Sequence, residues 1–226
     1  MHGDRSQPQN QGPPDERTSS DQACGGIRIR RGAYLPHWTR EGGVYSVTFR
    51  LADSLPASVL RAIVREREGI LRRAAAMGRD LSVYERRRLD RLHSERIERY
   101  LDAGYGACYL RDPRVASLVR DAIVHFEGER YRLAAWCIMP NHVHVVLRPE
   151  HGHALSAVLH SWKSFTAARA NQLLGRSGAF WQPESYDHLV RDEEELHRTV
   201  EYVRANPRAA GLVDWPWAWP SECARE

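Results

Sequence analysis

The sequence predicts an α+β fold, with one antiparallel β-sheet and helices packed on one face of it. Three observations predict this fold. Residues 44–51 alternate and are rich in β-branched and aromatic side chains; two further strand-like segments, 131–138 and 142–147, follow one another closely; and apolar residues at helical spacing fill the intervals. The resulting order of strand, helices, strand, strand, helix, strand and helix suits a single sheet with its helices.

The first strand is followed by a long helical region that begins at Pro56 and extends to about Leu101, with a break at residues 77–80. Residues 56–106 contain 12 Arg against 8 Asp and Glu. We interpret this region as a solvated helical hairpin with ion pairs between positions i and i+4, in which phosphate contacts are incidental.

The later elements follow from start and stop signals. Asp112 and Pro113 begin a helix that precedes the two closely spaced strands, and a further helix spans about 156–174 and ends at Gly175. Residues 179–190 are a short strand or an extended edge. The last helix begins near Asp192, carries three glutamates in its first turn, and is predicted to stop before Pro207.

Composition limits the class of protein. The 226 residues include 33 Lys and Arg against 29 Asp and Glu, a net charge of +4 that permits nucleic-acid binding without establishing it. No run approaches the ~18 apolar residues of a membrane-spanning helix, and no charged-then-apolar leader opens the chain. We therefore expect a cytoplasmic protein without a membrane partner. The four cysteines have no C-x-x-C spacing and are expected to be reduced thiols, not zinc ligands.

Residues 142–147 (HVHVVL) carry the first chemical signal. Successive side chains of a strand point to opposite faces, so His142 and His144 share one face. Two imidazoles at this spacing can bind one divalent cation. The alternative is a pair of surface histidines on a half-exposed strand. We expect exposed positions, at which alanine would leave the fold intact.

The second signal lies in the last helix, where Tyr202 and Asn206 are four residues apart and therefore neighbours on one face. Taken alone, such a tyrosine is more often a packing residue, and an asparagine before a proline is more often a helix terminus.

Together these segments resemble a known family. The strand P-N-H-V-H-V-V-L, the segment from Phe180-Trp181-Gln182 to Tyr186-Asp187-His188, and the helix E-Y-V-R-A-N-P-R-A-A-G-L resemble the single-tyrosine HUH transposases. Within that class they are most similar to the REP-associated tyrosine transposases, bacterial relatives of insertion-sequence transposases. The resemblance covers roughly residues 34–220.

The resemblance implies a ferredoxin-like sheet and a set of site residues. His142 and His144 match the metal ligands, Tyr202 matches the nucleophile, and Asn206 matches the polar residue that completes the metal site. It implies a divalent ion, Mg2+ or Mn2+, and transfer of single-stranded or hairpin DNA through a 5′-phosphotyrosine. The domain would span residues 27–220, with residues 56–106 as a helical insertion. A tail at 1–26, expected to be disordered, would precede it, and a short tail at 221–226 would follow it.

The expected partner is the single-stranded flank of hairpin-forming DNA repeats, bound in the cytoplasm at the nucleoid by a monomer or homodimer. His188 is a candidate auxiliary group for proton transfer or ligand orientation, or a structural residue. Seven basic residues are weaker candidates for contacts with DNA phosphates, and each could instead be an ordinary solvent-exposed charge. They are Arg28, Arg30, Arg31, Lys163, Arg169, Arg191 and Arg204.

Two alternatives remain open from the sequence. The first is a non-catalytic nucleic-acid-binding module on the same scaffold, which would have no physical need for the complete set of two histidines, tyrosine and asparagine. The second is a metal-dependent hydrolase that uses water at the two histidines, which leaves Tyr202 without a role.

Overall fold

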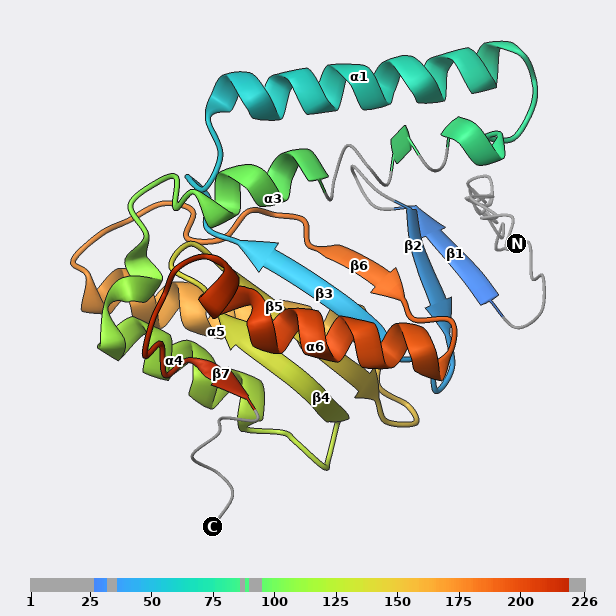
Figure 1. Ribbon diagram of the computed structural model, residues 1–226. Helices are drawn as coiled ribbons and strands as arrows, with labels where there is room; N and C mark the ends of the chain where they lie inside the picture. The colour runs from blue at the N-terminus through green and yellow to red at the C-terminus, as the bar shows by residue number, and fades with distance from the viewer. Residues whose placement is uncertain (1–26, 32–35, 86–87, 90–94, 220–226) are drawn as a thin grey trace, which may run out of the picture.

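A five-stranded antiparallel sheet organises the fold, with the strands in the order β6-β3-β5-β4-β7 (Figure 1). The computed structural model describes residues 27–31, 36–85, 88–89 and 95–219. The predicted tails, 1–26 and 221–226, lie outside the described residues. The strand bounds are β3 Tyr45–Arg50, β4 Tyr131–Ile138, β5 His142–Pro149, β6 Tyr186–Leu189 and β7 Ala218–Trp219.

The first four of these strands have the ferredoxin-like connection. Helix α4 (Pro113–Val124) joins β3 to β4, and α5 (Leu155–Leu173) joins β5 to β6, which gives the order β-α-β-β-α-β. Asp112 caps α4 as expected, since its carboxylate accepts the Arg114 backbone N–H at 2.9 Å. The predicted α+β class and sheet are confirmed.

Helices cover both faces of the sheet, so the expectation of helices on one face is wrong. Val143, Val145 and Leu147 point into a core shared with α4 and α5. Val146 points to the other face, where it packs with Val203 of α6 (Glu193–Ala209). In Figure 1, α6 lies in front of the sheet, and α4 and α5 lie behind it. The sequence showed each helix as amphipathic but did not show which face it covers.

Helix α6 begins where predicted and ends later. The Asp192 side chain accepts the Glu195 backbone N–H at 2.8 Å, which is an N-cap. The helix then continues through Pro207 to Ala209, so the predicted stop before Pro207 is wrong. A proline this close to the end removes one helical hydrogen bond, while burial of Asn206 and Pro207 holds the turn against the sheet. The Leu212 N–H bonds to the Pro207 carbonyl at 2.8 Å and closes the end.

The arginine-rich region forms a helical layer along one side of the molecule (Figure 1). Helix α1 (Ala57–Ala76) ends at the predicted break, and α3 (Glu95–Asp102) packs beside it through an apolar cluster. The buried members of the cluster are Leu55, Val59, Ile63, Ile97 and Leu101. Glu66 and Arg88 form a 2.7 Å ion pair between separate segments of the region.

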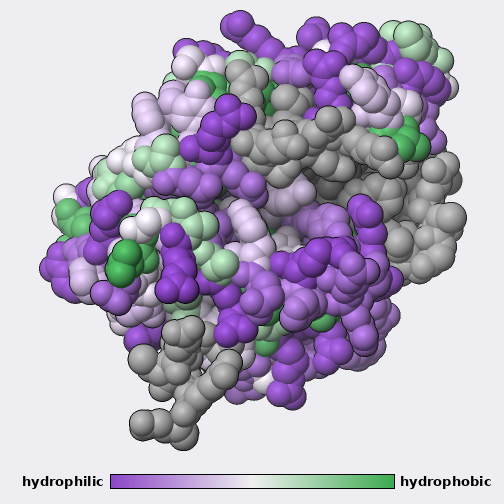
Figure 2. Space-filling view, viewed as in Figure 1, coloured by the Kyte–Doolittle hydropathy of each residue, from purple (hydrophilic) through white to green (hydrophobic). Residues whose placement is uncertain are grey.

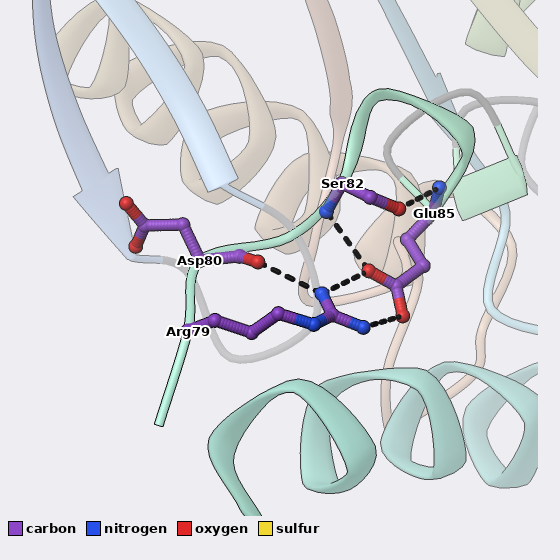
Figure 3. A network of polar contacts seen from close by, with 4 residues as sticks. All are labelled: Arg79, Asp80, Ser82 and Glu85. Carbon is purple, nitrogen blue, oxygen red and sulfur yellow. Dashed lines mark hydrogen bonds and ion pairs between the residues drawn. The ribbon is translucent and has the colours of Figure 1, made fainter. Parts of the chain in front are cut away.

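The turn after α1 is held by a polar network, shown in Figure 3. Arg79 donates to both carboxylate oxygens of Glu85, at 2.7 and 3.0 Å, and the Ser82 backbone N–H donates to the same carboxylate at 2.8 Å. These contacts hold the pKa of Glu85 down at about 2. The two ion pairs named for this region therefore join positions 6 and 22 residues apart, unlike the i,i+4 pairs that were expected.

Strands β1 (Ile27–Arg31) and β2 (Pro36–Arg40) form a separate two-stranded antiparallel sheet whose second strand lies beside β6. At the opposite edge of the main sheet, the Ile138 N–H donates to the Trp217 carbonyl and the Trp215 Nε1 donates to the Ile138 carbonyl. No helix of the described part of the chain is both long and apolar enough to cross a membrane. Cys108 and Cys137 are free and buried.

We predict that Val203→Ala lowers the free energy of unfolding by about 2 kcal/mol, because a fully buried side chain that joins α6 to β4 and β5 would leave a cavity. Chemical denaturation measures this loss. Val213→Ala is the matched control, since Val213 is 82% exposed and should change stability by less than about 0.5 kcal/mol. Equal effects of the two substitutions would contradict the described packing of α6.

Candidate active site

Two imidazoles face each other at the start of β5. The Nε2 atoms of His142 and His144 lie 2.9 Å apart, and the rings are nearly perpendicular with centroids 4.6 Å apart. Their shared face follows from the alternation of the strand. This part of the sequence prediction is confirmed.

Both imidazoles are buried, which corrects the expectation of exposed positions. His142 is 1% and His144 is 2% exposed, because their face of the sheet is the one that α6 covers. Burial lowers the pKa of His144 to about 4. Burial, with the added charges of His144 and Arg50, lowers the pKa of His142 well below its usual value. Both rings are therefore neutral near pH 7, which is the form that binds metal.

Two neighbours orient the rings through their other nitrogens. Asn141 Oδ1 lies 2.8 Å from His142 Nδ1, while the Asn141 amide nitrogen donates to the Tyr105 carbonyl at 2.9 Å. Because that oxygen can only accept, His142 Nδ1 carries the proton and Nε2 keeps its lone pair. Thr48 Oγ1 lies 2.8 Å from His144 Nδ1 and, as a hydroxyl, can donate or accept. The register places Thr48 directly opposite His144.

Tyr202 of α6 lies over this pair. Its ring centroid is 5.7 Å from that of His144, at an interplanar angle of 79°, and the residue is 43% exposed. Burial of the hydroxyl raises the pKa of Tyr202 above its usual value of 10, and the carboxylates of Glu98 and Asp102 raise it further. A hydrogen bond from Asn206 acts in the opposite direction. The phenol is therefore protonated near neutral pH.

Asn206 lies one helical turn after Tyr202 and is 5% exposed. Within the described structure its Oδ1 atom is buried and has no hydrogen-bond partner. A buried polar atom without a partner is costly and needs an explanation. A cation bound between this oxygen and the imidazoles would supply one.

The donor set fits a divalent cation. Two nitrogens that occupy neighbouring positions of an octahedron, each about 2.1 Å from the ion, are about 3 Å apart, and the two Nε2 atoms are 2.9 Å apart. Among the described residues no group of three or more His, Cys, Asp or Glu side chains could hold a metal. The protein would thus contribute two imidazoles and one amide oxygen, and other ligand positions would be open.

Three side chains of this site were not among the residues predicted from the sequence. Thr48 comes from β3, and Glu98 and Asp102 come from α3, on segments distant from the motifs. Asn141 was quoted within the strand motif but was given no role. For Glu98 and Asp102 no local signal exists, since only the packing of α3 beside α6 brings them to the tyrosine.

The remaining candidate residues make their described contacts with groups other than the two imidazoles. His188 Nε2 lies 3.0 Å from Glu195 Oε1, and no described contact joins it to the two imidazoles. Arg204 pairs with Glu201 at 3.0 Å, while Arg169 and Arg191 are exposed. Lys163 donates to the Pro183 carbonyl at 2.7 Å. Arg28, Arg30 and Arg31 lie on β1, and their side chains are outside the described structure.

Comparisons with known proteins agree with the motifs. Residues 112–206 match the family model described as "Transposase IS200 like". This range includes His142, His144, Tyr202 and Asn206. The REP-associated tyrosine transposase of Escherichia coli (strain K12) is 28% identical over 111 residues, which are 45% of this chain and 62% of the relative.

A Haemophilus influenzae protein provisionally named as the same kind of transposase is 28% identical over 102 residues, 39% of this chain and 58% of the relative. The matches thus cover less than two thirds of either relative. A solved structure of a REP-associated tyrosine transposase bound to a REP hairpin covers 84% of this chain and 80% of its own, with 18% identity and a TM-score of 0.46. The resemblance to the IS200-like and REP-associated tyrosine transposases that the motifs predict is therefore confirmed by the family model and the sequence relatives.

Proposed function

We propose that this protein is a metal-dependent transposase that nicks and rejoins single-stranded DNA beside hairpin-forming repeats. One observation carries the proposal: the ring of Tyr202 on α6 lies against the imidazole pair of β5. Asn206 interacts with the same tyrosine one helical turn later. The matched family segment and the transposase relatives support the same class of reaction.

Tyr202 is the proposed nucleophile. Its oxygen attacks the phosphorus of a phosphodiester, the bond from phosphorus to the 3′ oxygen breaks, and the DNA 5′ end remains on the enzyme as a phosphotyrosine. The 3′ oxygen takes up a proton and leaves as a hydroxyl, so that the reverse attack by a 3′ hydroxyl rejoins a strand. Tyr202 is 43% exposed as a residue, so a DNA strand can approach it from solvent.

The phenol needs a proton acceptor, because its pKa is raised and the neutral form is a poor nucleophile. Glu98 hydrogen-bonds the hydroxyl and is the acceptor we assign, with Asp102 adding negative charge nearby. Asn206 hydrogen-bonds the phenol as well. Together these side chains hold the hydroxyl next to the imidazole pair before the strand binds.

His142, His144 and Asn206 are the residues that would hold the cation, Mg2+ or Mn2+. When bound, such an ion polarises the phosphate and neutralises the charge that develops on its oxygens. Thr48 and Asn141 fix the orientation of the ring nitrogens, as outer neighbours of metal ligands commonly do.

Replacing both histidines with glutamine should lower Mn2+ affinity by about tenfold or more, because two ring nitrogens that define the site are removed. Glutamine is chosen over alanine because the rings are buried and alanine would leave cavities. Isothermal calorimetry with Mn2+ alone measures the change. His160→Gln, at an exposed position, is the control, and unchanged affinity in the double variant would exclude this metal site.

Tyr202→Phe should abolish cleavage of a hairpin oligonucleotide with single-stranded flanks, while Mn2+ affinity stays within about twofold of the wild type. The substitution removes one oxygen and leaves the three metal-binding side chains in place. Denaturing gels with end-labelled DNA measure cleavage. Tyr84→Phe, at a 64% exposed position, is the control and should cut normally. A Tyr202→Phe enzyme that still cuts would indicate a hydrolase that uses water.

Glu98→Gln should lower the pKa of Tyr202, because a negative charge beside the hydroxyl opposes ionisation and glutamine removes it. Tyrosine-selective 13C NMR across a pH series measures the titration, with the Tyr202 signal assigned by its absence from Tyr202→Phe. Glu194→Gln in the first turn of α6 should leave the titration unchanged. An unchanged or higher pKa in Glu98→Gln would remove Glu98 from the site.

A further inference from the structure

A second group of charged side chains lies at the end of β3, beside the imidazole pair. Arg50 is the direct cross-strand partner of His142. Residues directly opposite in an antiparallel pair project to the same face, so Arg50 lies on the face that carries the two histidines. Its charge is close enough to lower the pKa of His142.

Lys163 and Glu184 complete this group from two other parts of the chain. Lys163 comes from α5 on the opposite face, and its ammonium group donates to the Pro183 carbonyl at 2.7 Å and lies 3.4 Å from Ser185 Oγ. Glu184 acts electrostatically on both Arg50 and Lys163. The Gln182 N–H donates to the Arg50 carbonyl at 2.9 Å, which ties this loop along the end of β3.

Two cations and one carboxylate make up this group. Two cations share one acidic partner, and burial opposes the charge on both: it lowers the pKa of Arg50 to about 10 and that of Lys163 to about 8. In the described structure the Arg50 Nε atom is buried without a hydrogen-bond partner. The Glu184 Oε2 atom is buried without a hydrogen-bond partner in the described structure too. A buried donor without a partner is costly, and an anion bound at Arg50 would satisfy its Nε–H.

We propose that Arg50, supported by Lys163, binds a phosphodiester group of the DNA strand next to the group that is cut. A guanidinium presents a planar fork of donors that matches phosphate oxygens. Neighbouring strands lie about 5 Å apart, so Arg50 on β3 is close enough to the imidazoles on β5 to contact the same DNA strand. This inference rests on the proposed function, since it assigns a contact to the same DNA strand.

A structural role for the same group makes a different prediction. If Arg50 only holds the loop at residues 180–185 against β3, its loss lowers stability and leaves the salt dependence of DNA binding unchanged. A phosphate contact instead contributes about 0.7 to the slope of log affinity against log salt for a single strand. The slope therefore separates the two roles.

The test is fluorescence anisotropy with a labelled hairpin oligonucleotide carrying single-stranded flanks, across a series of salt concentrations without divalent metal. We expect Arg50→Gln to weaken binding about fivefold to tenfold and to reduce the slope by about 0.7. Arg50→Lys should keep the slope, because it keeps the charge. Arg132→Gln, at the far end of β4 where Arg132 pairs with Glu150, is the control and should leave the slope as in the wild type.

Thermal denaturation of each variant accompanies the titrations. If Arg50→Gln does not fold, the Lys163→Gln variant is used instead to test the phosphate contact. We expect it to reduce the slope of log affinity against log salt. A wild-type slope in the folded Arg50→Gln variant, or equal reductions in Arg50→Gln and Arg132→Gln, would overturn the phosphate contact alone. Failure of the wild type to bind the oligonucleotide would overturn the proposed function and this inference together.

Discussion

The pairing of β5 between β3 and β4 is the constraint on which the rest of this structure depends. Because both neighbours are hydrogen-bonded to it and both of its faces are covered, each side chain of β5 has one allowed environment. Val143, Val145 and Leu147 face the core under α4 and α5. A shift of one residue would exchange these apolar side chains with the imidazoles and destroy both the core and the site.

Helix α6 converts this strand into a candidate catalytic centre. Val203 anchors the helix in the apolar cluster over β4 and β5. The preceding residue, Tyr202, lies against His144, and Asn206 lies buried one turn after Tyr202. The acidic end of α3 adds carboxylates beside the phenol. The surface around α6 is largely hydrophilic (Figure 2). The packing of α6, the proposed metal donors and the proposed nucleophile therefore depend on a single helix–sheet contact.

Local patterns were sufficient for the four main strands and most of the helices, but not for the β1–β2 sheet or for β7. They also paired the candidate site residues two by two. Alternation placed His142 and His144 on one face, and helical spacing placed Tyr202 beside Asn206. The burial of the histidines could not be predicted, because it depends on which face α6 covers, and that is decided by side-chain packing between distant segments. The same holds for Glu98 and Arg50, each of which meets its partner only through tertiary contacts. Pro207 was misjudged because the local cost of a proline is outweighed by burial of the last turn.

The most direct test of this account is mass spectrometry of the wild-type protein after incubation with Mn2+ and a hairpin oligonucleotide that has single-stranded flanks. The account predicts one covalent adduct, a 5′-phosphonucleotide on the peptide that contains Tyr202, together with a free 3′ hydroxyl on the released strand. An adduct on another residue, or cut DNA with no covalent protein species, would contradict it.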